Sequence, residues 1–330
     1  MPSRMFNQPL FDLVSYARRG PGQRDRLSPA EVDQIVRTVR RTPEVMVKVL
    51  ARGANDRAAV RKHLDYIGRK GELDLETDDG ERLRGKGIGQ DLVQDWALEL
   101  DEYRSKSDLV ATRGRQSPRL VHKLMFSMPA GTPSDKVLAA VRNFCREEFA
   151  LKHRYAMTLH TDEPHPHVHV VIKAMSEQGQ RMHIRKAMLQ QWRANFAQHL
   201  RNLGVPANAT QRFVRGETCP RKSDGIYRAN LRGASTHVRK RAQAIASDLL
   251  AGSTSVEPGR SRLLETRKVT ARGWLAVSDI LVRQGMPRIA DQTRRFVETM
   301  TPPRTDRDWI ASAILRHLPE PRTNVRSKSP

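Results

Sequence analysis

The stretch YAMTLHTDEPHPHVHVVIKAM, from Tyr155 to Met175, decides the fold that we expect. Its last part alternates as a β-strand does, with His167 and His169 on one face and apolar residues at the positions between and after them. A turn with two prolines separates this strand from residues 155–161, which have the pattern of a preceding strand. Tight antiparallel pairing would bring His160 opposite the pair. The sequence therefore predicts a hairpin that gathers three imidazoles.

These three histidines have the spacing of a metal site. His160, His167 and His169 would supply neutral nitrogen ligands and leave positions open for a substrate, as a catalytic metal requires. The other interpretation is that they pack or lie on the surface, as a lone His-x-His usually does. The stretch holds four of the chain's 11 histidines and two carboxylates, Asp162 and Glu163, between the ligands. This concentration favours metal binding.

The composition points to a polyanionic partner. The 330 residues carry a net charge of +23 and suffice for one large or two ordinary domains. Nucleic acid is the first candidate partner, and the alternative is a charge that only aids solubility. Two cysteines, Cys145 and Cys219, exclude a disulfide framework. The N-terminal segment has no apolar run for a signal peptide or a membrane span, so we expect a soluble, cytoplasmic protein.

The pattern of elements predicts an α+β fold with a central antiparallel β-sheet and helices on one face. We expect a basic N-terminal extension over residues 1–42, a main domain over 43–220, a basic and mainly helical region over 221–318, and a disordered tail over 319–330.

Periodicity and turn residues predict the elements one by one. In the main domain we expect strands at 45–50, 72–76 and 120–128 besides the hairpin, helices at 58–67, 90–103, 134–149 and 185–203, a basic loop at 80–89 and a polar loop at 104–118. Ser134 is expected to cap its helix. Outside this domain we expect helices at 29–40, 226–250, 263–283, 287–299 and 306–318.

Tyr66 falls in the last turn of the helix expected at 58–67, beside the basic pair Arg69 and Lys70. A tyrosine at this position can simply pack. It can also attack a phosphate that Arg69 and Lys70 hold, while a metal neutralises charge growing on phosphorus. The phenol, with a pKa near 10, needs help to lose its proton. Asp162 can accept that proton, or orient His160 by a hydrogen bond to its second nitrogen.

Three segments together resemble conjugative relaxases of the MOBP class, which are HUH endonucleases and include the T-DNA border-nicking enzyme. HTDEPHPHVH at residues 160–169 is similar to their third motif. HLDYIGRKGEL at 63–73 is similar to the first motif, and SMPAGT at 127–132 to the second. The motifs occur in the family's order, and the resemblance covers about residues 45–215.

This resemblance implies an HUH-type sheet with the His-x-His on a central strand, Tyr66 as the nucleophile, and a metal held by the three histidines. Ser127 would contact DNA near the nick. His165 is extra to the three ligands, and we expect it, like Glu163, to lie around the ligands or, for His165, to face solvent. The metal would be Mg²⁺ or Mn²⁺, although three imidazoles also suit Zn²⁺.

The resemblance also implies a biological setting. The substrate would be single-stranded origin DNA of a plasmid or an integrative element, cut to leave a 5′-phosphotyrosine and rejoined after transfer. Partners would be relaxosome accessory proteins and a type IV coupling protein. The location would be the bacterial cytoplasm, with passage of the protein into a recipient cell together with the DNA.

The sequence departs from the family pattern at several points, among them a region after about residue 220 without a matching motif, and it leaves two alternatives. An extension of some 40 residues precedes the first motif, and Lys173 stands where the family often has asparagine. One alternative is an HUH rolling-circle initiator or a transposase, but no helicase-type phosphate loop (Gly-x-x-x-x-Gly-Lys-Ser/Thr) occurs. The other is a non-catalytic origin-binding protein with a structural metal.

Overall fold

A computed structural model describes most of the chain. The described residues are 11–18, 24–50, 55–111, 118–218, 233, 235–252, 257 and 259–316. By internal contacts the chain forms two compact units: Met1–Phe11 with Pro29–Thr210, and Asp12–Ser28 with Gln211–Pro330. The expected domain boundaries at residues 42, 220 and 318 remain predictions, and the tail expected to be disordered lies outside the described residues.

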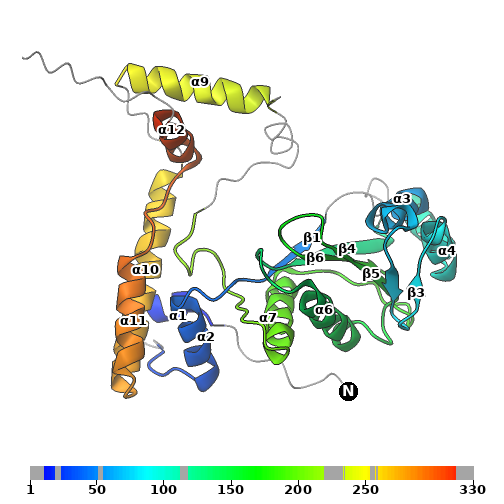
Figure 1. Cartoon of the computed structure of the whole chain (residues 1–330), viewed down its shortest axis with the longest axis horizontal. Coiled ribbons are helices and arrows are strands. Elements are labelled where there is room, and N and C mark those ends of the chain that lie inside the picture. The colour runs from blue at the N-terminus through cyan, green and yellow to red at the C-terminus, as the bar shows by residue number, and fades with distance from the viewer. Residues whose placement is uncertain are drawn as a thin grey trace, which may run out of the picture. The chain divides into compact units, whose positions relative to one another are not determined.

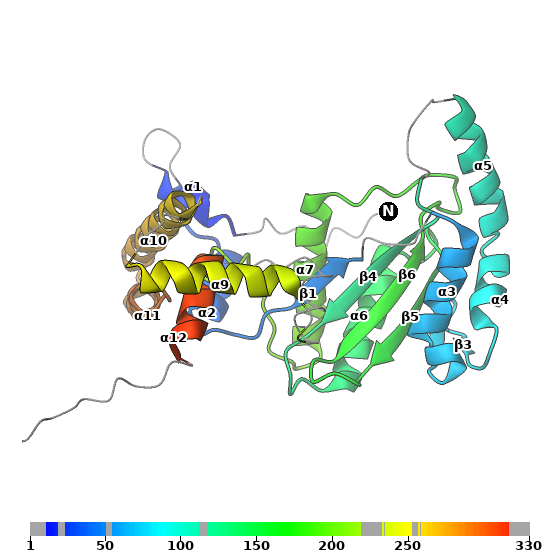
Figure 2. The ribbon, with the colours of Figure 1, turned by 90° about the horizontal axis from the view of Figure 1, so that it is seen from above.

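A six-stranded antiparallel sheet forms the centre of the first unit (Figure 1). Across the sheet the strands are β1 (Met46–Val49), β4 (Val121–Ser127), β6 (His167–Lys173), β5 (Tyr155–His160), β2 (Leu75–Thr77) and β3 (Arg82–Leu83). β5 and β6 are the hairpin expected from the sequence, and they lie in the middle of the sheet, with β6 beside β4 and β5 beside β2 (Figure 2). The predicted α+β fold with a central antiparallel sheet is confirmed.

Helices cover both faces of this sheet, which corrects the expectation of helices on one face. The helices that pack on it are α3 (Arg57–Ile67), α4 (Ile88–Asp95), α6 (Ser134–Glu148) and α7 (Lys186–Asn202). Val168 and Val170 of β6 face a core with α6 and α7. Val171 and Ala156 face a second core with α3 and α4. The apolar stripe of α3 needs its own sheet surface, and the alternation of the strands provides one.

The single helix expected at residues 90–103 is two helices. α4 ends before Trp96, and α5 (Leu98–Ala111) begins after Ala97, whose φ is +48°. Trp96 and Leu98 are both buried in the second core, so the chain bends between them to bury both side chains. Leu100, in the first turn of α5, is 56% exposed.

Smaller corrections concern loops, a strand end and a cap. The loop expected at 80–89 includes β3, and the segment expected as a loop at 104–118 is helical as far as Ala111. The strand expected at 72–76 is β2, which begins later, at Leu75, and ends at Thr77. Ser134 does not cap α6, because it already lies in the helix and Pro133 holds the N-cap position without a side-chain hydrogen bond.

The second unit is helical over its described residues. Its helices are α1 (Leu13–Ala17), α9 (Thr236–Leu250), α10 (Arg260–Arg283), α11 (Pro287–Glu298) and α12 (Asp306–Arg316), while α2 (Pro29–Val39) belongs to the first unit. Trp274 anchors α10, because its Nε1 donates to the Val214 carbonyl at 2.7 Å and its ring meets Phe296 of α11 at 5.3 Å. Arg307 joins α12 to α9 through Asp248 at 2.6 Å. Among the described residues, no helix combines the length and the apolar character that crossing a membrane requires.

Candidate active site and metal centre

α3 presents Tyr66 to solvent. The helix begins after Asp56, whose side chain accepts a hydrogen bond from a backbone amide of the first turn at 2.7 Å. Val60, Leu64 and Ile67 recur at helical spacing and are fully buried in the second core. Tyr66 lies outside this stripe and is 59% exposed. Its hydroxyl is therefore accessible to a ligand from solvent.

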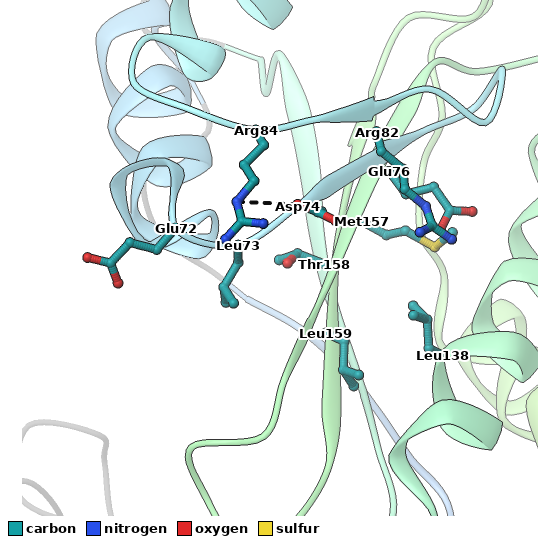
Figure 3. A pocket seen from close by; sticks show the side chains of 10 residues that line it. All are labelled: Glu72, Leu73, Asp74, Glu76, Arg82, Arg84, Leu138, Met157, Thr158 and Leu159. Carbon is teal, nitrogen blue, oxygen red and sulfur yellow. Dashed lines mark ion pairs between the residues drawn. The ribbon is translucent and has the colours of Figure 1, made fainter.

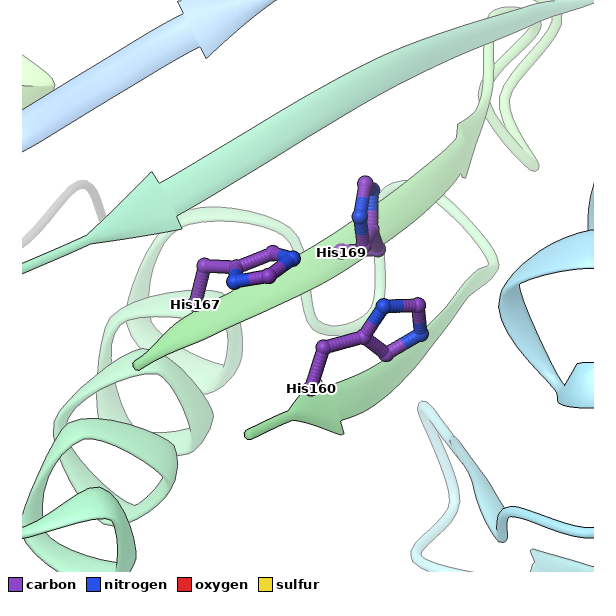
Figure 4. A group of neighbouring side chains, drawn as sticks. All are labelled: His160, His167 and His169. Carbon is purple, nitrogen blue, oxygen red and sulfur yellow. The ribbon is translucent and has the colours of Figure 1, made fainter. Parts of the chain in front are cut away.

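The β5–β6 hairpin brings the three histidines together on one face of the sheet. His160 pairs directly with His167, and Thr158 pairs with His169. The ring centroids lie 4.7–5.2 Å apart, and one potential ligand atom from each ring lies within 4.8 Å of the others. Figure 4 shows the rings gathered above the two strands. All three histidines are buried.

Backbone carbonyls determine which nitrogen two of these rings can offer. Nε2 of His160 lies 2.7 Å from the carbonyl oxygen of Ile67. A carbonyl only accepts hydrogen bonds, so Nε2 carries the proton and Nδ1 keeps its lone pair. By the same reasoning, Nδ1 of His167 donates to the carbonyl of His165 at 3.1 Å and leaves Nε2 available. Nδ1 of His169 is buried and lacks a hydrogen-bond partner among the described residues.

Burial keeps two of the rings in the form that binds metals. It lowers the pKa of His169 to about 3, with smaller contributions from His160, His167, His63 and Arg69. Burial also lowers the pKa of His160, although the hydrogen bond to Ile67 opposes this shift. Both imidazoles are therefore neutral at pH 7, and a neutral imidazole is the ligating species.

The chain turns sharply after α3 and carries Arg69 over the ring of Tyr66. The turn is a short 3-10 helix, η1 (Arg69–Gly71), in which φ is +50° at Arg69, +56° at Lys70 and +95° at Gly71. Such left-handed values are unfavourable for residues that have a Cβ. The guanidinium carbon of Arg69 lies 5.6 Å from the centroid of the Tyr66 ring. The turn with these unfavourable backbone angles thus places the cation of Arg69 over the ring of Tyr66, the candidate nucleophile.

Gly71→Ala is expected to destabilise the first unit more than Gly80→Ala does. Both glycines have positive φ, so both variants incur the left-handed cost, on the order of 1–2 kcal/mol. A Cβ at Gly71 would also lie 2.0 Å from the carbonyl oxygen of Gly85, whereas a Cβ at Gly80 would meet nothing within 4 Å. We expect Gly71→Ala to melt on the order of 5 °C below Gly80→Ala by circular dichroism. Equal melting temperatures would contradict the close packing of Gly71 on Gly85.

Asp162 links Arg69 to the histidines. Its carboxylate accepts a hydrogen bond from Nη2 of Arg69, and its Oδ1 lies 4.0 Å from Nδ1 of His160. The Asp162 side chain is about half exposed. Nε2 of His160 donates to the Ile67 carbonyl, so the backbone next to Tyr66 also orients this ring. Both roles considered for Asp162 remain predictions.

Sequence reasoning missed His63, which joins Tyr66 to the histidines from the other side. Its ring stacks on that of Tyr66, with centroids 6.4 Å apart and planes 20° apart, and meets His169 edge-on at 6.4 Å. Burial, followed by the charge of Lys123, lowers the pKa of His63 to about 4. Its Nε2 is buried, with no hydrogen-bond partner in the described part of the chain. The sequence signal that could have indicated this contact is the spacing of three residues, which places His63 and Tyr66 on one face of the helix.

The remaining predicted site residues differ in their burial and in their contacts with the three histidines. Ser127 is buried at the end of β4 and pairs directly with His167 across the sheet. Glu163 and His165 are exposed in the turn between β5 and β6, and His165 contacts His167 through its carbonyl. Lys70 is exposed in η1. Their predicted roles towards DNA and metal remain predictions.

The segment that carries this site is similar to a known protein family. Residues 66–205 match the family model described as relaxase, MobA/VirD2-like, nuclease domain. The match begins at Tyr66 and includes the three histidines. The resemblance to relaxases drawn from the three motifs is confirmed over this segment.

Curated relatives point to the same class. The T-DNA border endonuclease VirD2 of Rhizobium radiobacter is 28% identical over 144 residues, which is 39% of this chain and 31% of that protein. VirD2 of Rhizobium rhizogenes and of Agrobacterium fabrum (strain C58 / ATCC 33970) are each 28% identical over 142 residues, which is 39% of this chain and 30% of theirs. The alignments span less than a third of the relatives' length. Together with the family match they support the resemblance to a relaxase nuclease domain.

Proposed function

We propose that this chain cuts one strand of DNA by transesterification at Tyr66 and rejoins it after transfer, at the transfer origin of a plasmid or an integrative element. The observation that supports this proposal best is the arrangement around the exposed phenol. Tyr66 is joined to the cluster of buried imidazoles on one side through His63 and on the other through Arg69 and Asp162. The nucleophile and the metal centre thus form one connected group of side chains.

The proposed step exchanges one phosphate ester for another. Oη of Tyr66 forms a bond to phosphorus, and the bond from phosphorus to O3′ breaks. The leaving O3′ takes the electron pair and a proton, and the 5′ phosphate stays on the tyrosine. Asp162 is the acceptor that we propose for the phenol proton, since it is bound to the arginine that covers the ring. Arg69 stabilises the negative charge that develops there. The ester energy is retained, so the reverse reaction can rejoin the strand.

His160, His167 and His169 fit a divalent metal by their donor set. His160 and His167 each have one nitrogen committed to a carbonyl and the other available, and burial keeps His160 and His169 neutral. A bound cation would polarise the phosphate and neutralise charge on its oxygens. We propose Mg²⁺ or Mn²⁺ on the basis of the relaxase resemblance, with Zn²⁺ as the alternative that three imidazoles also favour.

The wider setting rests on the family resemblance. We propose that the chain acts in the bacterial cytoplasm with relaxosome accessory proteins and a type IV coupling protein, and that it passes with the DNA into a recipient cell. A net charge of +23 supports binding to single-stranded DNA, and this binding should weaken steeply with salt. An HUH replication initiator or transposase would use the same site, and a non-catalytic origin-binding protein would form no covalent intermediate.

Covalent capture of DNA tests this proposal. A random-sequence single-stranded library labelled at the 3′ end keeps its label on the fragment that the tyrosine retains. Incubation with Mg²⁺ or Mn²⁺ should give a labelled protein band that survives boiling in detergent, and EDTA should prevent it. Tight DNA binding without any such band under all these conditions would favour the non-catalytic reading.

His63→Ala is expected to slow adduct formation on the order of 100-fold, because a displaced nucleophile loses its alignment with the phosphate. The affinity for Mn²⁺ should change by less than about threefold, since His63 is not among the three grouped ligands. Single-turnover kinetics and calorimetry measure the two effects. Lys62→Ala, an exposed neighbour on α3, is the matched control. Equal rates for both variants would show that His63 does not position Tyr66.

A further inference from the structure

A cavity of about 330 Å³ opens beside β5 at the edge that faces β2 (Figure 3). β2 pairs with β5 only through Glu76 with Met157 and Thr77 with Ala156. The following residues, Thr158 and Leu159, line the cavity where that pairing has ended. The next residue along the strand is His160. The apolar lining residues Leu138, Met157 and Leu159 belong to the α6–α7 side of the sheet, whereas His169 meets His63 of α3 on the other face. None of the chemistry proposed for the histidines uses this cavity.

Apolar and charged side chains line this cavity, and the charged ones are Glu72, Asp74, Glu76, Arg82 and Arg84. Apolar side chains come from three separate segments: Leu73 in the turn after η1, Leu138 on α6 and Leu159 on β5. An ion pair lies beside them, with Nε of Arg84 3.8 Å from Oδ1 of Asp74 (Figure 3). Both charged side chains are well exposed, so the pair itself contributes little to stability. A ligand can therefore engage both groups at small cost.

We propose that this cavity binds one unstacked guanine base of the single strand that the chain cleaves. This inference rests on the proposed function and names the base that the site selects. Arginine donates well to O6 and N7 of guanine, and a carboxylate has two acceptors for its N1–H and N2–H groups. Arg84 and Asp74 supply both kinds of group side by side.

The apolar walls complete the match. An unstacked base exposes two apolar faces that water solvates poorly, and aliphatic side chains can cover them. Adenine would place an amino group where guanine has O6, opposite the donors of Arg84. Cytosine and thymine are smaller and would leave more of the cavity unfilled. The cavity is therefore expected to discriminate among bases rather than to hold the backbone.

Binding of defined oligonucleotides tests the inference apart from cleavage. The probes are a fluorescent 15-mer of thymidine and three copies in which the central residue is dG, dA or dC. Fluorescence anisotropy is measured with the full chain in EDTA, where no metal-assisted cutting occurs. We expect the dG probe to bind about tenfold more tightly than the thymidine probe, a difference of about 1.4 kcal/mol. The affinities of the dA and dC probes should stay within about threefold of the affinity of the thymidine probe.

Variants locate the preference. Asp74→Asn and Arg84→Ala should each abolish the preference for dG while changing the affinity for the thymidine probe by less than about threefold. Leu138→Trp should also abolish the preference for dG, because the larger side chain fills the cavity. Arg146→Ala removes one exposed positive charge on α6 outside the cavity and should keep the preference. Because Arg84→Ala is a surface change, it remains informative even where Leu138→Trp disturbs folding.

The outcomes separate this inference from the proposed function. Equal binding of all four probes would overturn the guanine pocket and leave single-strand binding intact. A dG preference that survives Asp74→Asn and Arg84→Ala would place recognition elsewhere and also overturn the pocket. No binding to any probe at low salt would overturn both the pocket and the proposed function.

Discussion

Tyr66→Phe is expected to reduce the covalent adduct at least about 10³-fold, effectively to background. Phenylalanine keeps the ring between His63 and Arg69 but lacks the oxygen that bonds to phosphorus. Affinity for single-stranded DNA in EDTA should stay within about twofold, because phosphate contacts by Lys and Arg dominate it. Adduct assays and anisotropy on the same preparations measure both quantities.

Two other tyrosines serve as controls. Tyr103 is 72% exposed on α5, so Tyr103→Phe tests whether exposure alone gives reactivity. Tyr155 is buried on the α6–α7 side of the sheet, and burial raises the pKa of its phenol, which makes it a poor nucleophile. Tyr103→Phe and Tyr155→Phe should both form adduct as the wild type does. An adduct that persists in Tyr66→Phe would contradict the assignment of the nucleophile.

His167→Ala is expected to weaken Mn²⁺ binding by more than about 100-fold. Loss of a residue that only supports a ligand typically costs 10–100-fold, and a lost ligand should cost more. Nε2 of His167 is the available nitrogen, because Nδ1 is committed to the His165 carbonyl. Adduct formation should fall in parallel at limiting metal. Calorimetry with Mn²⁺ and with Mg²⁺ measures the affinity directly.

His165→Ala is the matched control for this prediction. The residue lies two positions away in an exposed turn, and its backbone carbonyl, which orients His167, is kept in the variant. Its metal affinity should stay within about threefold of the wild type. Similar losses in the two variants would mean that the metal is held differently, and no loss in either would remove the three-histidine centre from the account.

The hairpin was predictable because it depends on local rules. Alternation with a period of two places His167 and His169 on one face, and the short turn leaves little choice of register for His160. The positive sign of the net charge follows from the composition, and the position of Tyr66 at a helix end follows from nearby residues. These features need no knowledge of how distant segments pack.

The parts that sequence reasoning missed depend on tertiary packing. Ile67 orients His160 through a backbone carbonyl, which no residue type signals. The break between α4 and α5 at Ala97 arises because Trp96 and Leu98 are buried in the same core, and the periodicity of the segment alone favours one helix. The contact of His63 with His169 appears only when α3 lies on the sheet.

The most direct test of the central claim is to map the DNA attachment site by mass spectrometry. The adduct formed with Mn²⁺ is digested with nuclease and protease, and the modified peptide is sequenced. We expect one modified residue, Tyr66, carrying a nucleotide through its 5′ phosphate. Attachment to any other residue, or a linkage through a 3′ phosphate, would contradict it.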